Sequence, residues 1–151
     1  NQPFQARQSS TDGIAISESS FSIGHDENVR LHIWDFGGQE IMHSTHQFFL
    51  TDSSIYLIVI NGREGREEWD VFYWIGMLKN FAKDSPIIVV LNKIKQYPFH
   101  LNTQFIQQHY NNAKFFVETD CADDTGIERL AQARAAVETI GLDRLEGMFG
   151  R

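Results

Sequence analysis

The sequence contains little cysteine, no long apolar run and no excess of positive charge. Cys121 is the single cysteine among 151 residues, which excludes an internal disulfide and fits the reducing cytoplasm. No run approaches the roughly 18 apolar residues of a transmembrane helix, and no charged-then-apolar start predicts a signal peptide. A net charge of -7 argues against non-specific binding to nucleic acid or to an anionic membrane surface. These absences predict a soluble, acidic, cytoplasmic protein.

Short apolar runs alternate with helical patterns along the chain. Apolar residues make up 42% of the sequence, enough for one compact domain over residues 1–151, with residues from about 141 beginning a connection to a following domain. Five strands are predicted, and the polar stretch between the first two could be a hairpin: Gly13–Ser17, Val29–Asp35, Ser54–Ile60, Pro86–Leu91 and Lys114–Glu118. Three helices are predicted: Glu67–Ala82, Leu101–Asn111 and Gly126–Ile140.

Two of the strand segments, Ser54–Ile60 and Pro86–Leu91, are continuous apolar runs rather than alternating ones. Such runs are typical of strands buried on both faces, as in a parallel sheet covered by helices. Strands that alternate with helices imply right-handed crossovers between parallel strands. We therefore predict an α/β fold, a three-layer sandwich with a mostly parallel sheet.

Polar residues and glycines follow several of these strands. In open α/β sheets, ligands bind beyond the carboxyl ends of the strands. The segments at that edge are Ser10 and Thr11 before the first strand, Asp35–Glu40, Asn92–Lys95 and Thr119–Ala122. A ligand is expected above this edge.

These segments resemble the nucleotide site of a Ras-like GTPase. The run "WDFGGQE" followed by "IMHSTHQFFLTDSSIYLIVI" is similar to the Roc (Ras of complex proteins) domain of Roco proteins, more than to an ordinary Ras or Rab. The likeness extends from about Ser9 to about Ile140. It implies a Ras-like fold and a GTP-binding switch that hydrolyses GTP to GDP. It also implies a COR dimerisation domain after the Roc domain, and hence a homodimer.

The resemblance assigns four residues to the phosphates and to Mg²⁺. Thr11 matches the switch threonine whose hydroxyl coordinates Mg²⁺, and Asp35 would hold the same ion through a water. Gly38 would donate its backbone N–H to the γ-phosphate, because a missing Cβ allows close approach. Gln39 matches the glutamine that orients the attacking water, since phosphoryl transfer depends on positioning and charge neutralisation.

The resemblance places the guanine base between two other loops, and here the sequence departs from the family. Asn92 and Lys93 would pack around the ring, and the backbone N–H of Cys121 or Ala122 would face its carbonyl oxygen. Ala122 stands where family members often have a lysine. The family's NKxD aspartate is replaced by Lys95, which has donors only. We expect that loss to weaken guanine binding by at least about 10²-fold.

The phosphate-binding loop, GxxxxGK[ST], is absent from residues 1–151. The opening "NQPFQARQSSTDGI" resembles the region after the helix that follows that loop, so the family's first strand, loop and first helix are expected to be missing. In a Ras-like sheet that strand lies between Val29–Asp35 and Ser54–Ile60. Either the natural protein continues upstream, or the sheet closes by direct pairing or through a second chain. These residues alone are expected to bind GTP poorly and to hydrolyse it negligibly.

Other readings of the same residues remain open. The domain could be a GTPase-like scaffold that binds no nucleotide and serves dimerisation, or an unrelated enzyme that uses Asp35 and His43. His43 and His46 could share a helix face as metal ligands or be surface residues. The aromatic row of residues 69 and 72–74 could be core or could cover a neighbouring domain.

Overall fold

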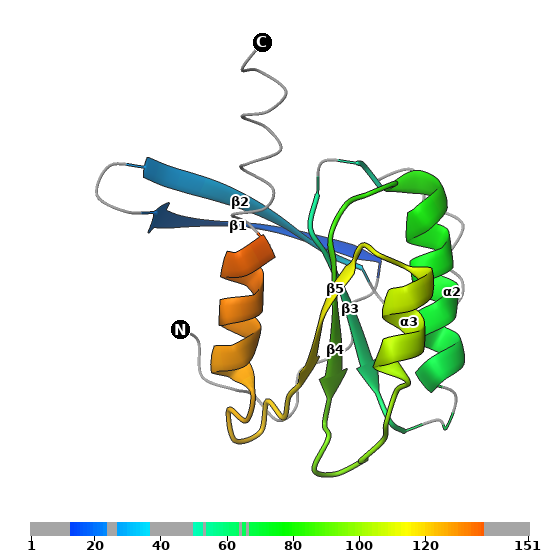
Figure 1. The fold of residues 1–151 in the computed structure, drawn as a ribbon. Helices are drawn as coiled ribbons and strands as arrows, with labels where there is room; N and C mark the ends of the chain where they lie inside the picture. The colour runs from blue at the N-terminus through cyan, green and yellow to red at the C-terminus, as the bar shows by residue number, and fades with distance from the viewer. Residues whose placement is uncertain are drawn as a thin grey trace. The chain divides into compact units, whose positions relative to one another are not determined.

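The computed structural model describes residues 13–23, 27–36, 50–52, 54–63, 65 and 67–137 (Figure 1). The chain divides into two compact units, one of residues Gln5–Phe49 and one of Asn1–Phe4 with Leu50–Arg151. Each unit is described by itself.

The smaller unit contains an antiparallel hairpin. Strand β1, Ile14–Ile23, pairs with β2, Glu27–Phe36, in a continuous register from Ile14↔Phe36 to Ile23↔Glu27. This confirms the predicted hairpin, although both strands are longer than predicted. The ladder continues because each backbone group along it finds a partner across the pair, even where the side chains are polar.

The larger unit is built on a parallel sheet of three strands in the order β3-β4-β5. These strands are Tyr56–Asn61, Ile87–Asn92 and Ala113–Glu118. Strand β4 is the central one, and its residues from Ile87 to Leu91 are all buried. For β4, the continuous apolar run therefore correctly predicted a strand buried on both faces.

Helices cover both faces of this sheet. Helices α2, Glu67–Phe81, and α3, Thr103–His109, lie on one face, and a helix of residues 127–137 lies on the other (Figure 1). The first face buries Ile58, Ile60, Val71, Ile75, Leu78, Ala82, Ile87, Val89, Leu91, Ile106 and Ala113. The opposite face buries Ile88, Val90, Val117, Ala133 and Val137. The predicted three-layer α/β sandwich with a parallel sheet is confirmed.

Strand β3 differs from the prediction of burial on both faces. Ile58 and Ile60 are buried, but Leu57 is 49% exposed and Val59 58% exposed. Among the described residues β3 pairs with a strand on one edge only, and its second face lacks a covering element at these two positions. The expectation of two buried faces is therefore wrong for β3 in this structure.

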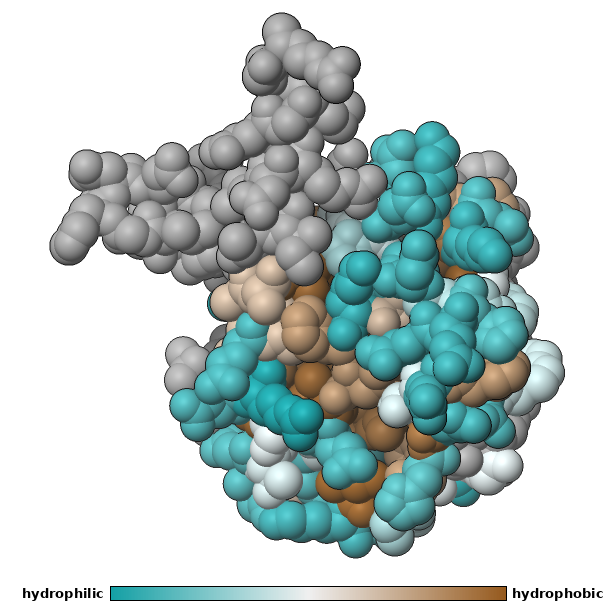
Figure 2. Space-filling model, viewed as in Figure 1, coloured by the Kyte–Doolittle hydropathy of each residue, from teal (hydrophilic) through white to brown (hydrophobic). Residues whose placement is uncertain are grey.

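The aromatic residues of α2 divide between the core and the surface. Phe72 and Trp74 pack against the core, whereas Trp69 is 62% exposed and stacks on Tyr73 with ring centroids 5.4 Å apart. Figure 2 shows apolar residues gathered over the sheet, between the helices of its two faces, and bordered by hydrophilic ones. In the described part of the chain, no helix is long and apolar enough to cross a membrane.

Candidate functional site

Two loops meet where β4 and β5 end. Because the strands are parallel neighbours, their carboxyl ends lie at the same edge of the sheet, with Leu91 opposite Glu118. Backbone hydrogen bonds join the loops: Thr119 N–H donates to the carbonyl of Leu91 at 2.8 Å, and Ile94 N–H donates to the carbonyl of Thr119 at 3.3 Å. The sequence-predicted segments after these two strands are therefore fixed against each other.

Asn92 is the polar centre of this junction. Its side-chain Oδ1 accepts from Lys93 N–H at 2.9 Å, from the Thr119 hydroxyl at 3.2 Å and from the Cys121 thiol at 3.4 Å. Three donors on one oxygen fix the orientation of the amide, so its Nδ2 group is turned away from them. Asn92 thus presents an N–H₂ donor at a defined position above the sheet edge.

Lys93 adopts a left-handed backbone conformation, with φ of 59°. A residue with a Cβ pays roughly 1–2 kcal/mol in this region. Two hydrogen bonds hold the turn, because the Lys93 carbonyl accepts from Gln96 N–H at 3.1 Å and from Tyr97 N–H at 2.8 Å. Strained backbone that is held by neighbouring bonds is common at binding sites.

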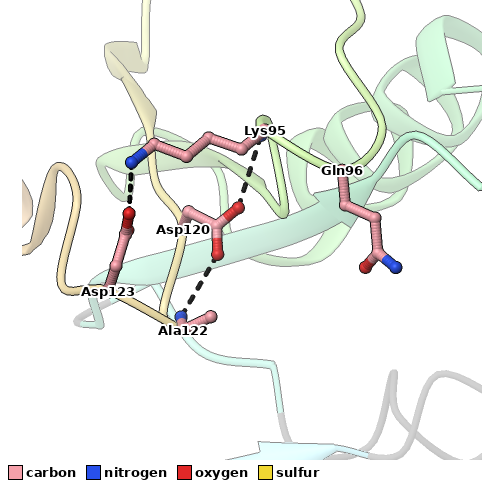
Figure 3. Close-up of a pocket in the computed structure, with 5 residues that line it drawn as sticks. All are labelled: Lys95, Gln96, Asp120, Ala122 and Asp123. Atoms are coloured by element: carbon pink, nitrogen blue, oxygen red, sulfur yellow. Dashed lines mark hydrogen bonds and ion pairs between the residues drawn. The ribbon is translucent and has the colours of Figure 1, made fainter.

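Asp120 lies between the two loops and is only 6% exposed. Its Oδ2 accepts from the backbone N–H of Lys95 at 3.3 Å, and its Oδ1 accepts from the N–H of Ala122 at 3.2 Å (Figure 3). The Asp120 N–H donates to the Thr125 carbonyl at 2.9 Å. This carboxylate therefore fixes both loops.

The Lys95 ammonium forms an ion pair with the Asp123 carboxylate (Figure 3). Asp123 also accepts from Thr125 N–H through Oδ1 at 3.2 Å. The hydrogen bond from the Lys95 side chain, followed by those from the side chain and the backbone of Thr125, lowers the pKa of Asp123 from 3.8 to about 2. The lysine side chain thus ends on a carboxylate of its own protein.

An open cavity of about 360 Å³ lies at this position. It is lined by Lys95, Gln96, Asp120, Ala122 and Asp123. The lining is charged and amide-bearing, and the Asn92 junction lies at the base of the same two loops. The cavity therefore presents both hydrogen-bond donors and acceptors to a ligand.

The structure brings together four of the sequence-predicted site residues: Asn92, Lys93, Cys121 and Ala122. Asp35 lies near the end of β2, in the other compact unit.

Thr11, Gly38, Gln39, His43 and His46 lie outside the described residues. Within the described part, no group of three or more His, Cys, Asp or Glu residues could hold a metal ion.

Sequence reasoning missed Asp120. It is the residue between Thr119 and Cys121, both of which belong to the segment already singled out. The available signal was an acidic side chain two residues after the end of β5, at the same sheet edge as Lys95. Its burial and its bonds to both loops could not be inferred from that position alone.

A match to a family model identifies the family of the chain. The model described as "Ras of Complex, Roc, domain of DAPkinase" matches residues 1–95. The chain belongs to the Roc family. Among curated relatives, this Roc domain is 32% identical over 150 residues to the probable serine/threonine-protein kinase pats1 of Dictyostelium discoideum. It is 31% identical over 116 residues to a Roc-COR-CHAT protease of an unknown prokaryotic organism.

These matches cover most of this Roc domain and little of the relatives. They take in 85% of the chain but 5% of the kinase, and 70% of the chain but 11% of the protease. A solved structure of Methanosarcina barkeri Roco2 RocCORdC bound to GDP resembles the chain with a TM-score of 0.79 and 39% sequence identity. That likeness covers 89% of this chain and 41% of the other. The fold is Ras-like, as predicted.

Proposed function

We propose that this Roc domain is a guanine-nucleotide switch that binds GTP and hydrolyses it to GDP within a Roco-type protein. One observation carries the proposal: the loops after β4 and β5 are joined around Asn92 beside a polar cavity. The 39% identity to a Roco2 protein bound to GDP supports reading this cavity as the base site.

The loops after β4 and β5 bind the base. Asn92 Nδ2 and the stem of Lys93 flank the ring, since the Oδ1 of Asn92 is already engaged by three donors. The Ala122 N–H donates to Asp120. The Cys121 N–H is therefore the donor to the base carbonyl oxygen. The sequence had left open whether the Cys121 or the Ala122 N–H takes this role.

Phosphate and metal binding involve residues of the preceding segment. Thr11 would coordinate Mg²⁺ through its hydroxyl, and Asp35 would hold the same ion through a water; oxygen groups of this kind are the hard donors that Mg²⁺ prefers. When bound, Mg²⁺ neutralises charge on the phosphates. Gly38 would donate its N–H to the γ-phosphate, and Gln39 would position the attacking water.

The rest of the phosphate site belongs to the longer protein in this proposal. The GxxxxGK[ST] loop is not among residues 1–151. Within the described part of the chain, one edge of β3 has no paired strand, and the strand before that loop would pair there. A COR domain and homodimerisation belong to the same proposal, supported by the Roc-COR-CHAT and RocCORdC relatives. A cytoplasmic location follows from cysteine usage.

Thermal unfolding of the full-length protein with and without Mg²⁺-GTP tests the proposed function. A ligand at 100 times its dissociation constant stabilises the folded state by about 2.7 kcal/mol, so Mg²⁺-GTP should raise the Roc melting temperature. Mg²⁺-ATP at the same concentration is the matched control and should leave it unchanged. An unchanged melting temperature with GTP rejects nucleotide binding.

A second function is a nucleotide-free scaffold for dimerisation or protein-protein interaction. It is favoured by one observation: Lys95 stands where the family has a base-binding aspartate, and its ammonium is paired with Asp123. For a scaffold, saturating GTP or GDP leaves both the melting temperature and the oligomeric state of the full-length protein unchanged. For a switch, at least the melting temperature responds.

A further inference from the structure

The edge of a guanine base presents two adjacent N–H donors, which require acceptors in the protein. Lys95 has only donors on its side chain, so it cannot accept these hydrogen bonds. The side chain of Lys95 reaches to Asp123 and ends in an ion pair there (Figure 3). The acceptors for the base edge must therefore come from another residue that lines the cavity.

Asp120 has the properties of that acceptor. It lines the cavity, and only 6% of its surface is exposed. Each carboxylate oxygen accepts one backbone N–H, from Lys95 at 3.3 Å and from Ala122 at 3.2 Å. An ionised carboxylate has about four acceptor sites, so each oxygen retains capacity for a further donor.

The ion pair of Lys95 with Asp123 keeps the ammonium occupied. Asp123 is itself held by Thr125 N–H at 3.2 Å, so the partner of the lysine is fixed in the loop. A positive charge that pointed at the base would repel the N–H edge of guanine. The pairing removes that charge from the base and leaves Asp120 as the anionic group between the loops.

We propose that Asp120 is the base-edge acceptor of this Roc domain, and that the Lys95–Asp123 ion pair is a positioning device that holds the lysine away from the base. This inference rests on the proposed function. It names the ligand as a purine nucleotide with two neighbouring N–H donors, at N1 and the 2-amino group. The acceptor therefore lies in the loop after β5, whereas the family's aspartate lies in the loop after β4.

The inference gives a definite order of affinities. Hypoxanthine lacks the 2-amino group, so IDP loses one charge-assisted bond and should bind at least about tenfold more weakly than GDP. Xanthine has a carbonyl oxygen in place of that amino group, which would face the Asp120 carboxylate. XDP should therefore bind at least about 100-fold more weakly than GDP.

The test is competition of GDP, IDP and XDP against a fluorescent GDP analogue on the full-length protein, wild type and Asp120→Asn. The amide of the variant offers an N–H donor to the xanthine carbonyl, so the preference should reverse from GDP to XDP. Asp124→Asn is the matched control, because Asp124 lies in the same loop and does not line the cavity. Its ratio of GDP to XDP affinity should equal that of the wild type.

Two further variants separate the roles of the charged pair. Lys95→Met should keep a preference for GDP over XDP, since the ammonium does not contact the base. Asp123→Asn releases the lysine and should reduce that preference by about tenfold. If Asp120→Asn does not fold, the wild-type affinities and Lys95→Met decide. A wild-type preference for XDP that Lys95→Met abolishes would show that the lysine faces the base, and would overturn the inference.

These measurements separate a wrong assignment of Asp120 from a failure of the proposed function. If the wild type binds GDP and Asp120→Asn leaves the ratio of GDP to XDP unchanged, Asp120 is not the acceptor and the proposed function stands. If the wild type binds none of the three nucleotides, the proposed function fails and the inference fails with it.

Discussion

Lys95 and Asp120, two side chains of opposite charge, lie in neighbouring loops and line the same cavity. A lysine in the loop after β4 would be unfavourable next to the donors of a guanine edge. The structure instead pairs it with Asp123 and leaves Asp120 facing both loops. In the proposed base site, Asp120 would therefore supply the acceptor that position 95 lacks.

The ionisation of Asp123 can be tested directly. Its pKa is lowered to about 2, first by the bond from Lys95, so Lys95→Met should raise it towards 3.8. Carboxyl carbon NMR across an acid titration measures the change. Lys114→Met, which removes an exposed lysine on β5, should leave the Asp123 pKa at about 2 and serves as the control. An Asp123 pKa that stays the same in Lys95→Met would contradict the ion pair.

The lowered pKa of Asp123 makes the stability of the folded protein depend on pH in the acidic range. The folded-state pKa lies below the unfolded value near 3.8, so the folded state binds fewer protons between these two pH values. The ion pair therefore stabilises the folded protein fully above pH 3.8, and that contribution is lost as the pH falls through about 2. Lys95→Met should consequently flatten the loss of stability in this acidic window.

At the scale of elements, Gly126 sets the approach of the helix of residues 127–137 to β5. Its φ is 74°, in the left-handed region, and a Cβ there would overlap with the carbonyl oxygen of Glu118. The loop of residues 119–125 can close over the sheet edge because this backbone approach is possible. The geometry of the candidate base site thus depends on a glycine that does not line its cavity.

Gly126→Ala should therefore destabilise the Roc domain by at least about 3 kcal/mol, because it combines a steric overlap with backbone strain. Gly65→Ala is the matched control: its φ is 69°, but nothing lies within 4 Å of the added Cβ. Strain alone should cost about 1 kcal/mol there. Urea unfolding measures both variants, and equal losses of stability would contradict the close approach at Gly126.

Strand β3 gives a second prediction at the scale of elements. Its sequence is as apolar as that of a strand buried on both faces, yet Val59 is 58% exposed here. If the longer protein covers this face, Val59→Thr in the full-length chain should cost about 1–3 kcal/mol, since a hydroxyl would be buried. Val89→Thr, at a fully buried position of β4, is the comparison and should cost a similar amount. A near-neutral Val59→Thr would show that the face stays exposed.

The sequence predicted the order of the elements and the layering of the larger unit. The predictable parts depend on local sequence patterns. One example is the short apolar run of β4, whose five consecutive residues are buried as such a run predicts. Boundaries moved by one or two residues where caps decide them. Helix α3 begins at Thr103 rather than at Leu101 because the Asn102 side chain accepts from Phe105 N–H at 3.0 Å.

Other features were not predictable because they depend on contacts distant in sequence. Asp120 and Lys95 are 25 residues apart, and neither residue type alone indicates that the carboxylate receives the lysine's backbone N–H. Leu57 and Val59 are exposed because no described element covers that face of β3. The apolar sequence of β3 alone does not reveal which elements cover it. The division into two compact units was also not expected, and a single Roc domain over residues 1–151 stays a prediction.

The most direct measurement is a calorimetric titration of Mg²⁺-GDP into the nucleotide-free full-length protein, with Mg²⁺-ADP as the comparison. The account predicts one saturable site for GDP with a dissociation constant of about 1 μM or tighter, corresponding to about -8 kcal/mol, and no saturable binding of ADP. Absence of GDP binding, or equal binding of GDP and ADP, would contradict the assignment of the cavity beside Asn92 and Asp120 as a guanine site.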